Sequence, residues 1–210
     1  MNDKIKDILE FIKAGVPVLT VNTRLSRYLR ASFDTEMQVN GDAAWPTPVI
    51  MPLFSWIESL WNESWPDRPL LSRARAQALW ERVVSGDTLL SKDIINNRGV
   101  AKSAYDAYAM IQEYRVTLPE EIYLTEEAKA LKRWADTYEK EVERLGFIEQ
   151  SSLFGRVIEL IKNRRITVAE RVVFAGFDEM SPRMESLIKV IEGGGGRVEF
   201  WPEHNLQPSI

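Results

Sequence analysis

The sequence predicts an α/β protein whose parallel sheet layer is divided by a large all-helical insertion. Short apolar runs alternate with helical periodicity over residues 1–66, and again over 166–210, of the 210-residue chain. Residues 67–165 show helical periodicity and no convincing strand. Strands that alternate with helices favour a parallel sheet. We therefore expect an α/β domain built from both ends of the chain and a helical domain inserted within it.

The first part of the chain predicts two strands, each followed by a helix. Apolar residues recur with a helical period over 3–14, and a short apolar run follows at 16–21. Thr23 is the expected N-cap of the next helix. A second strand is expected at 47–51, between prolines, and Pro52 suits the first turn of another helix.

The insertion is predicted to contain helices only. Ser72 and Thr125 are expected N-caps, because their hydroxyl groups can accept hydrogen bonds from the first helical amides. Lys162, Arg164 and Arg165 fall at the end of the last helix, where cations suit the helix dipole. The four expected helices cover residues 72–84, 91–114, 125–145 and 151–163.

The alternation of strand and helix then resumes. A strand is expected at 171–175, a helix at 181–192 and a further strand at 197–201, with the four glycines 193–196 as the turn between the last two. After Trp201 the chain is polar and contains proline. From this tail we expect the chain to be a fragment of a longer protein.

Composition limits the functions that the chain can have. Hydrophobic residues make up 45% and charged residues 28%, as in ordinary globular proteins. The absence of cysteine excludes disulfides, thiolate zinc sites and cysteine nucleophiles. No apolar run approaches the roughly 20 residues that span a bilayer, and no signal peptide is visible, so we expect a cytoplasmic protein with no membrane partner. The net charge of −4 does not favour nucleic-acid binding by the chain as a whole, so such binding would need a local basic patch.

Tryptophan is abundant. Large indole rings usually fill a core and its edges, and this is the main interpretation; exposed rings could instead serve as platforms on which bases stack. The seven residues are Trp45, Trp56, Trp61, Trp65, Trp80, Trp134 and Trp201.

Three segments together resemble one protein family. They are VLTVNTRLSRYLR at 18–30, WPTPVIMPL at 45–53, which runs on to Trp61, and VVFAGFDEMSP at 172–182. The chain resembles the N-terminal region of bacterial probable DNA-repair proteins that end in a PD-(D/E)XK nuclease domain. Those proteins are similar in turn to AddB and RecC subunits, whose N-terminal halves are superfamily 1 helicase-like.

The resemblance implies both a fold and a function. The fold would be a P-loop-NTPase-like sheet of the superfamily 1 helicase 1A type, with a 1B-like helical insertion. The function would lie in DNA repair and recombination, with DNA as a partner and a PD-(D/E)XK nuclease domain in the same chain, beyond Ile210. A partner helicase subunit is a further candidate partner.

The first nucleotide motif of the family is degenerate in this chain. An active P-loop reads G-x-x-x-x-G-K-[ST]; its glycines let backbone amides close around the phosphates, and its lysine neutralises their charge. At this turn the chain has Asn22, Thr23 and Arg24, with neither glycine nor lysine. Because β-carbons would block the phosphate cradle, we expect no ATP binding and no cofactor.

The second nucleotide motif, a strand-end aspartate that holds magnesium, is also missing. AddB-type proteins resemble this stretch with an aspartate directly before Gly-Phe, and here that position is Ala175. The motif-like residues Gly176, Phe177, Asp178 and Glu179 follow it. The two acids could form a metal pair, but their register favours the start of a loop or a helix cap. We expect no metal site.

Two basic clusters are candidates for contact with DNA. The first, Arg24, Arg27 and Arg30, lies on one face of the helix that starts at the former phosphate turn. The second lies in the insertion, which the resemblance places near duplex DNA. Ordinary solvated faces or pairing with acids of another domain remain alternatives for both clusters. The second cluster consists of Arg73, Arg75 and Arg82.

These features favour a non-catalytic function. The main hypothesis is an ATPase-inactivated helicase-like domain that guides DNA or scaffolds a nuclease in a DNA-end-processing protein. The alternative is a docking module for a partner helicase subunit that makes no contact with DNA. An active NTPase would need the motifs that the chain lacks. His204 is the only histidine and has no neighbours for a triad or a zinc site, so no catalytic residue is expected.

Overall fold

The computed structural model describes residues 3–87, 96–117, 119–120 and 124–202, which form eight helices and four strands. The chain divides into two compact units, a sheet unit (Met1–Trp65 with Arg156–Ile210) and a helical unit (Pro66–Gly155). In chain order the elements are α1 (Asp3–Lys13), β1 (Val18–Thr20), α2 (Thr23–Val39), β2 (Ile50–Pro52), α3 (Leu53–Glu63), α4 (Arg73–Ser85), α5 (Asn97–Tyr114), α6 (Glu126–Arg144), α7 (Gln150–Lys162), β3 (Arg171–Ala175), α8 (Pro182–Gly193) and β4 (Arg197–Trp201).

The four strands form one parallel sheet, which confirms the predicted α/β class with a parallel layer. Their order is β2-β1-β3-β4. Val18 of β1 pairs with Ile50 on one side and with Val173 on the other, and β3 continues the sheet by pairing with β4. From β1 the chain continues to β2 on one side of β1, and then crosses to β3 on the other side of β1. The sheet therefore has a topological switch point between β1 and β3.

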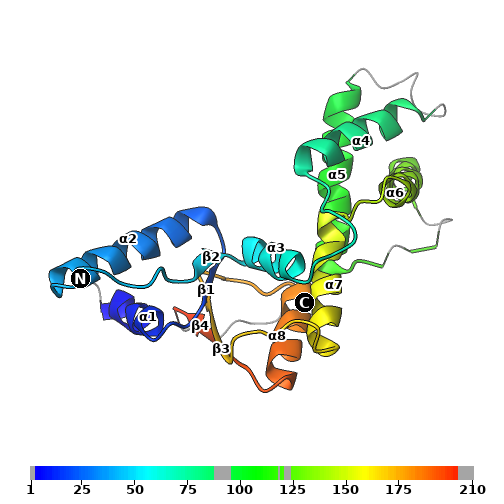
Figure 1. Cartoon of the computed structure of the whole chain (residues 1–210). Coiled ribbons are helices and arrows are strands. Elements are labelled where there is room, and N and C mark those ends of the chain that lie inside the picture. Colours follow the sequence, from blue (N-terminus) through cyan, green and yellow to red (C-terminus); the bar gives the residue numbers. More distant parts are fainter. Residues whose placement is uncertain (1–2, 88–95, 118, 121–123, 203–210) are drawn as a thin grey trace. The chain divides into compact units, whose positions relative to one another are not determined.

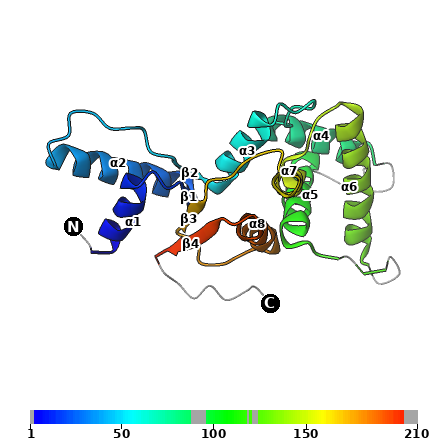
Figure 2. The same ribbon diagram turned by 60° about the horizontal axis from the view of Figure 1, so that its bottom comes forward.

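Helices cover both faces of the sheet (Figure 1). On one face, α1 and α2 bury Ile8, Leu9 and Leu29 against Val18 and Val173. Because side chains alternate along a strand, Leu19 and Phe174 point to the opposite face. There α3 contacts β1 and β2, and α8 contacts β4. The second view shows the same two helical layers with the sheet between them (Figure 2).

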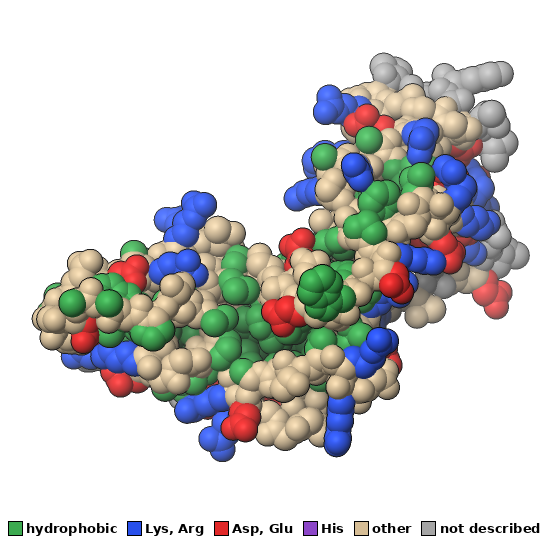
Figure 3. Space-filling model, in the orientation of Figure 1, with side chains coloured by type: hydrophobic (Ala, Val, Ile, Leu, Met, Phe, Trp, Pro, Cys, Tyr) green, Lys and Arg blue, Asp and Glu red, His purple; other side chains and the backbone are tan. Residues whose placement is uncertain are grey.

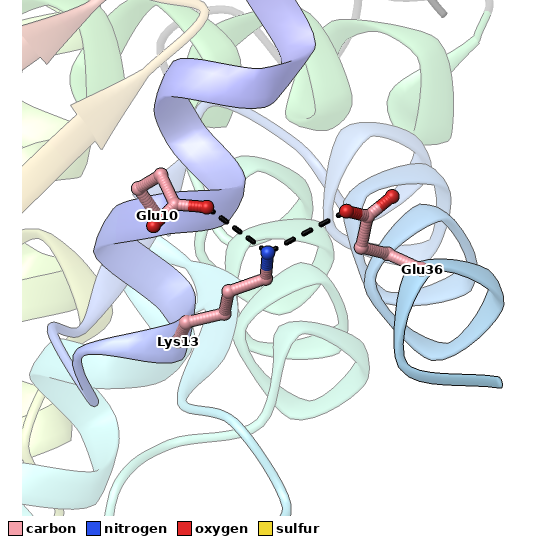
Figure 4. A network of polar contacts seen from close by, with 3 residues as sticks. All are labelled: Glu10, Lys13 and Glu36. Carbon is pink, nitrogen blue, oxygen red and sulfur yellow. Dashed lines mark hydrogen bonds and ion pairs between the residues drawn. The ribbon is translucent and has the colours of Figure 1, made fainter. Parts of the chain in front are cut away.

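An ion-pair network joins α1 to α2 on the first face. The Lys13 Nζ donates to Glu10 Oε1 at 3.0 Å, one turn earlier in α1, and to Glu36 Oε1 of α2 at 3.5 Å (Figure 4). The hydrogen bond and charge of Glu10, assisted by those of Glu36, raise the pKa of Lys13 above its usual value. The network adds a polar tie between two helices whose apolar faces already pack together.

The helical unit has an aromatic core. Trp80 of α4 is fully buried, and its ring lies 4.9 Å from that of Tyr138 in α6 and 5.5 Å from that of Tyr108 in α5, centroid to centroid. Tyr105 of α5 joins the same group at 6.2 Å from Trp80. Tilted and edge-on rings at such distances attract one another in addition to the apolar area that they bury. Contacts among these aromatic rings therefore hold α4, α5 and α6 together.

Three predicted starts of helices are confirmed and one is wrong. Ser72 and Thr125 cap α4 and α6, and Ser181 caps α8 next to Pro182, where the sequence predicted that a helix begins. Thr23 does not cap α2, because the side chain of Asn22 accepts the hydrogen bond from the Leu25 amide instead. Asn and Thr are both good capping residues, and the chain places the first of the two at the cap.

Other differences concern the ends of elements. The second strand begins three residues later than expected, at Ile50, after the prolines. The predicted helix 91–114 corresponds to α5, and its first residues, 91–95, lie outside the described residues, as does His204. The sequence placed the return to the sheet unit at 165/166, after the last helix of the insertion. The division instead falls within α7, whose part from Arg156 onward belongs to the sheet unit.

The tryptophans separate into buried and exposed residues. Trp56 and Trp61 of α3 are buried, as are Trp80 and Trp134 in the helical unit, in agreement with the core interpretation. Trp65 is 90% exposed.

Across the described part of the chain, no helix is both long and apolar enough to cross a membrane.

Candidate functional site

The candidate site is the switch point of the sheet, at the carboxyl ends of β1 and β3. In open parallel sheets, ligands bind in the crevice at this place. The loop after β1 carries Asn22 and leads into Thr23 and Arg24, and the loop after β3 carries Gly176–Glu179. The two loops touch, because the Val21 amide donates to the carbonyl of Ala175 at 3.0 Å. The structure thus brings together the two motifs that the sequence singled out.

The loop after β1 is closed by its own polar groups. The Thr20 hydroxyl, fully buried, donates to the Asn22 carbonyl at 2.9 Å and shares a 2.5 Å hydrogen bond with the Ser26 hydroxyl. The Asn22 side chain accepts from the Leu25 amide at 2.9 Å. A helix N-terminus binds phosphate through amides that lack a partner within the helix. At α2 one of these amides is already bonded to the chain itself.

Two apolar side chains near the start of α2, Leu25 and the 47% exposed Val21, lie against the loop after β3. Gly176 has a φ of +77°, and a β-carbon there would lie 2.6 Å from Leu25 Cδ2 and 3.3 Å from Val21 Cγ1. Leu25 and Val21 thus press against the backbone of the second loop. Here glycine accommodates two apolar side chains of the same chain.

Ala175, the last residue of β3, faces the core. Its side chain is fully buried in the cluster formed by α1, α2 and the sheet. A carboxylate there would be buried away from the edge of the sheet. Asp178 and Glu179 are exposed in the loop before α8, and neither caps that helix, because Ser181 does. Within residues 3–87, 96–117, 119–120 and 124–202, no group of three His, Asp or Glu side chains could hold a metal ion.

The first basic cluster divides by role. Arg30 donates from Nη2 to the Ile50 carbonyl at 3.0 Å, so it ties α2 to β2. Arg24 and Arg27 are exposed and form no ion pair with any described residue. Lys and Arg side chains project from the surface over α2 in the space-filling view (Figure 3). The two free guanidinium groups lie in the first turns of α2, next to the switch point.

The second basic cluster lies in the helical unit and is partly engaged. The Arg75 guanidinium stacks over the Phe147 ring, 5.3 Å from its centroid. Arg82 approaches Glu141 at 3.9 Å, and both groups are partly exposed. Arg73, at the first position of α4, is exposed. Positive charge in the first turn of a helix interacts unfavourably with the helix dipole. For Arg75, the cation–π contact with Phe147 offsets part of this cost.

Sequence reasoning missed a buried acid in the helical unit. Glu149 is 7% exposed, and its carboxylate accepts hydrogen bonds from the amide and the hydroxyl of Ser151 at the start of α7. Burial and then the charge of Glu149 raise the pKa of Tyr105 to about 12. The same two causes, in the same order, raise the pKa of Tyr138 still further. The available signal was an acid, Glu149, placed two residues before the serine pair Ser151-Ser152 at a helix start.

No protein-family model matches this chain, and no curated protein is similar enough to be matched to it.

Proposed function

We propose that this chain is an ATPase-inactivated, helicase-like domain of a DNA-repair protein of the AddB/RecC type, which guides DNA without hydrolysing nucleotide. The observation that carries the proposal is the closed switch point. A parallel sheet with helices on both faces keeps the architecture of a nucleotide-binding domain. At its switch point, Leu25 and the 47% exposed Val21 lie against the backbone of Gly176, in the place of a ligand.

Two independent losses support inactivation rather than an altered mode of ATP binding. Asn22 occupies an amide of α2 that would be needed for phosphate. Ala175 replaces the metal aspartate with a methyl group buried in the core. Restoring either feature alone would leave the other missing. A domain that no longer hydrolyses ATP still retains its packing and its surface, and that surface provides the proposed path for DNA.

The proposed DNA contact at this site consists of Arg24 and Arg27. Both are exposed beside the switch point and form no ion pair in the described part of the chain. Free guanidinium groups on one helix face suit the phosphates of a strand, because they neutralise charge and release counterions. The net charge of −4 requires binding to depend on such a local patch.

The test is fluorescence anisotropy of labelled duplex-end and single-stranded DNA, titrated with the whole chain from about 50 to about 300 mM salt. We expect binding that weakens steeply with salt. The double variant Arg24→Ala/Arg27→Ala should weaken it at least tenfold and lower the salt slope by about 2. The matched control is Lys132→Ala/Lys140→Ala, which removes the same charge from the exposed face of α6. No binding by the wild type, or an equal loss in the control, would overturn the proposal.

A nucleotide experiment tests the inactivation separately. A ligand that binds the folded state raises the unfolding temperature by linkage. We expect Mg-ATP, at about 100 times a typical ATPase dissociation constant, to leave the unfolding temperature unchanged. At that concentration, a protein that binds ATP would gain about 2.7 kcal/mol in its free energy of unfolding. A clear rise would show that the switch point accepts nucleotide.

A second candidate function is docking to a partner helicase subunit through the helical unit. Met110 and Tyr114 lie four residues apart on α5, are 64% and 43% exposed, and are followed by Val116 at 50%. Adjacent exposed apolar side chains of this kind mark interaction sites. Light scattering of the chain mixed with a purified partner helicase should show a complex that Met110→Ser/Tyr114→Ser abolishes. DNA binding unaffected by this variant would separate the two functions.

A further inference from the structure

A basic groove lies at the edge of the sheet opposite the switch point, within the sheet unit. Its walls are the segment after α7 and the glycine turn 193–196, at the amino ends of β3 and β4. The Arg197 amide donates to the Glu170 carbonyl at 2.8 Å and joins the two walls at the base. Lys and Arg side chains project along the lower border of this unit, beneath β3 and α8 (Figure 3).

Cations dominate the lining of the groove. Its charged side chains are five cations and one acid: Lys162, Arg164, Arg171, Lys189, Arg197 and Glu170. Three of the cations have acidic partners nearby, since Lys162 pairs with Glu159 at 2.8 Å, Arg171 with Glu199 at 2.6 Å, and Lys189 with Glu185 at 3.8 Å. Arg164 and Arg197 are exposed and have no ion-pair partner among the described residues. These two guanidinium groups are available to a ligand.

The helix dipoles explain only part of this charge. Both α7 and α8 end at the groove, and their carbonyl ends attract cations. Lys162, in the last turn of α7, fits this role. Arg164 lies beyond the helix, at a left-handed φ of +54°. The Arg164 amide donates to the Ile161 carbonyl, and the Arg165 amide donates to the Leu160 carbonyl. These two hydrogen bonds form a Schellman motif, in which glycine is the favoured residue at the left-handed position.

Arg164 occupies a left-handed position that glycine prefers, as Trp65 and Arg115 do elsewhere in the described residues, so the conformation needs a second observation beside it. A residue held in an unfavourable conformation points to a function for its side chain when other observations agree. Here the agreement comes from Arg197, the second free guanidinium group on the opposite wall. The glycine turn adds access, because β-carbons at Gly193 and Gly195 would meet open space. A ligand can therefore approach the backbone between the two arginines.

The hydrogen bonds of the turn indicate which phosphate fits. The amides of Gly194, Gly195, Gly196 and Arg197 all donate to carbonyls of the chain itself. The turn therefore lacks the free amides that cradle the terminal phosphate of a nucleotide. Guanidinium groups on two walls suit the single charges spaced along a phosphodiester strand.

We propose that this groove is a second phosphate-binding site, in which Arg164 and Arg197 hold the backbone of a single DNA strand. The inference rests on the proposed function, because it supplies the DNA path with a contact at the other edge of the sheet. Lys162, Arg171 and Lys189 add positive potential around the strand, and their acidic partners limit it.

The test uses the whole chain and a labelled single strand of about 20 nucleotides. We expect the double variant Arg164→Gly/Arg197→Ala to lose at least fivefold in affinity. Arg164→Gly alone should weaken binding while its unfolding temperature stays equal or rises, because glycine suits the left-handed position. Weakened binding together with a more stable fold separates a lost contact from a damaged fold. The Lys132→Ala/Lys140→Ala control should retain wild-type affinity.

The outcomes separate this inference from the proposed function. If Arg164→Gly/Arg197→Ala binds like the wild type while Arg24→Ala/Arg27→Ala does not, the groove is not a DNA site and the proposed function stands. If only the groove variant loses binding, the groove is the site and the contact at α2 is wrong. If the groove arginines are needed for anionic vesicles and not for DNA, or if the wild type binds no DNA, the inference is overturned.

Discussion

Gly176 and Leu25 lie in contact across the switch point, so closely that a β-carbon on the glycine would be 2.6 Å from Leu25 Cδ2. The glycine follows β3, and the leucine belongs to the first turn of α2, which follows β1. This contact lies at the place where an open parallel sheet binds its ligand. It joins the loop after β3 to the start of α2 within the sheet unit.

Gly176→Ala should destabilise the chain. The left-handed φ of +77° costs an alanine about 1–2 kcal/mol, and the contact with Leu25 adds overpacking of about 1–3 kcal/mol. Urea unfolding measures the sum. The control is Gly155→Ala in α7, where a β-carbon meets open space and helix propensity predicts a gain of up to about 1 kcal/mol. The double variant Gly176→Ala/Leu25→Ala should lose less free energy of unfolding than the two single variants lose in sum. Strict additivity would show that Leu25 does not limit the space available to a β-carbon at position 176.

Asn22→Ala should cost about 1 kcal/mol in unfolding free energy, because the Leu25 amide loses its capping acceptor. The neighbouring Thr23→Ala is the matched control, since Thr23 is exposed and its hydroxyl does not cap α2. Chemical denaturation of both variants decides between the two residues. A larger loss for Thr23→Ala would return the cap to the residue that the sequence favoured.

The difference between Asn22 and Thr23 illustrates what the sequence could and could not predict. Element types were predictable because the apolar periods are strong; the helical pattern of 3–14 became α1, and the apolar run 171–175 became β3. The choice between two adjacent capping residues depends on backbone geometry, and either residue type is suitable. The order β2-β1-β3-β4 and the contact between Gly176 and Leu25 join segments far apart in the chain, so local patterns do not encode them.

The candidate site was predictable to a similar extent. The absence of glycine and lysine from the turn after β1 is readable from residue types alone, and so is the alanine at position 175. The use of Arg30 as a tie to the Ile50 carbonyl is not, because Arg24, Arg27 and Arg30 have the same spacing along the helix. Only the pairing of β1 with β2 places a carbonyl within reach of Arg30.

The ion-pair network around Lys13 predicts a change of stability at alkaline pH. Its pKa is raised by Glu10 and Glu36, so the folded state holds this proton more tightly than the unfolded state does. The contribution is complete below pH 10.5, the unperturbed value, and is lost as the pH rises through the higher pKa of the folded state. Thermal unfolding of the wild type and Lys13→Met should therefore differ at neutral pH and converge once the pH has risen through the raised pKa of Lys13.

Salt and a matched variant check the origin of this effect. Because Lys13 lies near the surface, salt should reduce the difference at neutral pH. Lys140→Met, at an exposed position of α6, should leave the unfolding temperature almost unchanged at every pH. A difference between wild type and Lys13→Met that persists after Lys13 has lost its proton would show that packing of the side chain, and not its charge, joins α1 to α2.

Tyr105 should ionise unusually late. Burial, and next the charge of Glu149, raises its pKa to about 12, whereas exposed phenols titrate near 10. Absorbance at alkaline pH should show a late phase that Tyr105→Phe reduces and that Glu149→Gln moves toward lower pH. Since the folded state keeps the phenol proton between pH 10 and 12, stability should fall across that window in the wild type and less in Tyr105→Phe. If Tyr105 lost its proton near the unperturbed value of 10.0, the helical unit would be open to water at this core.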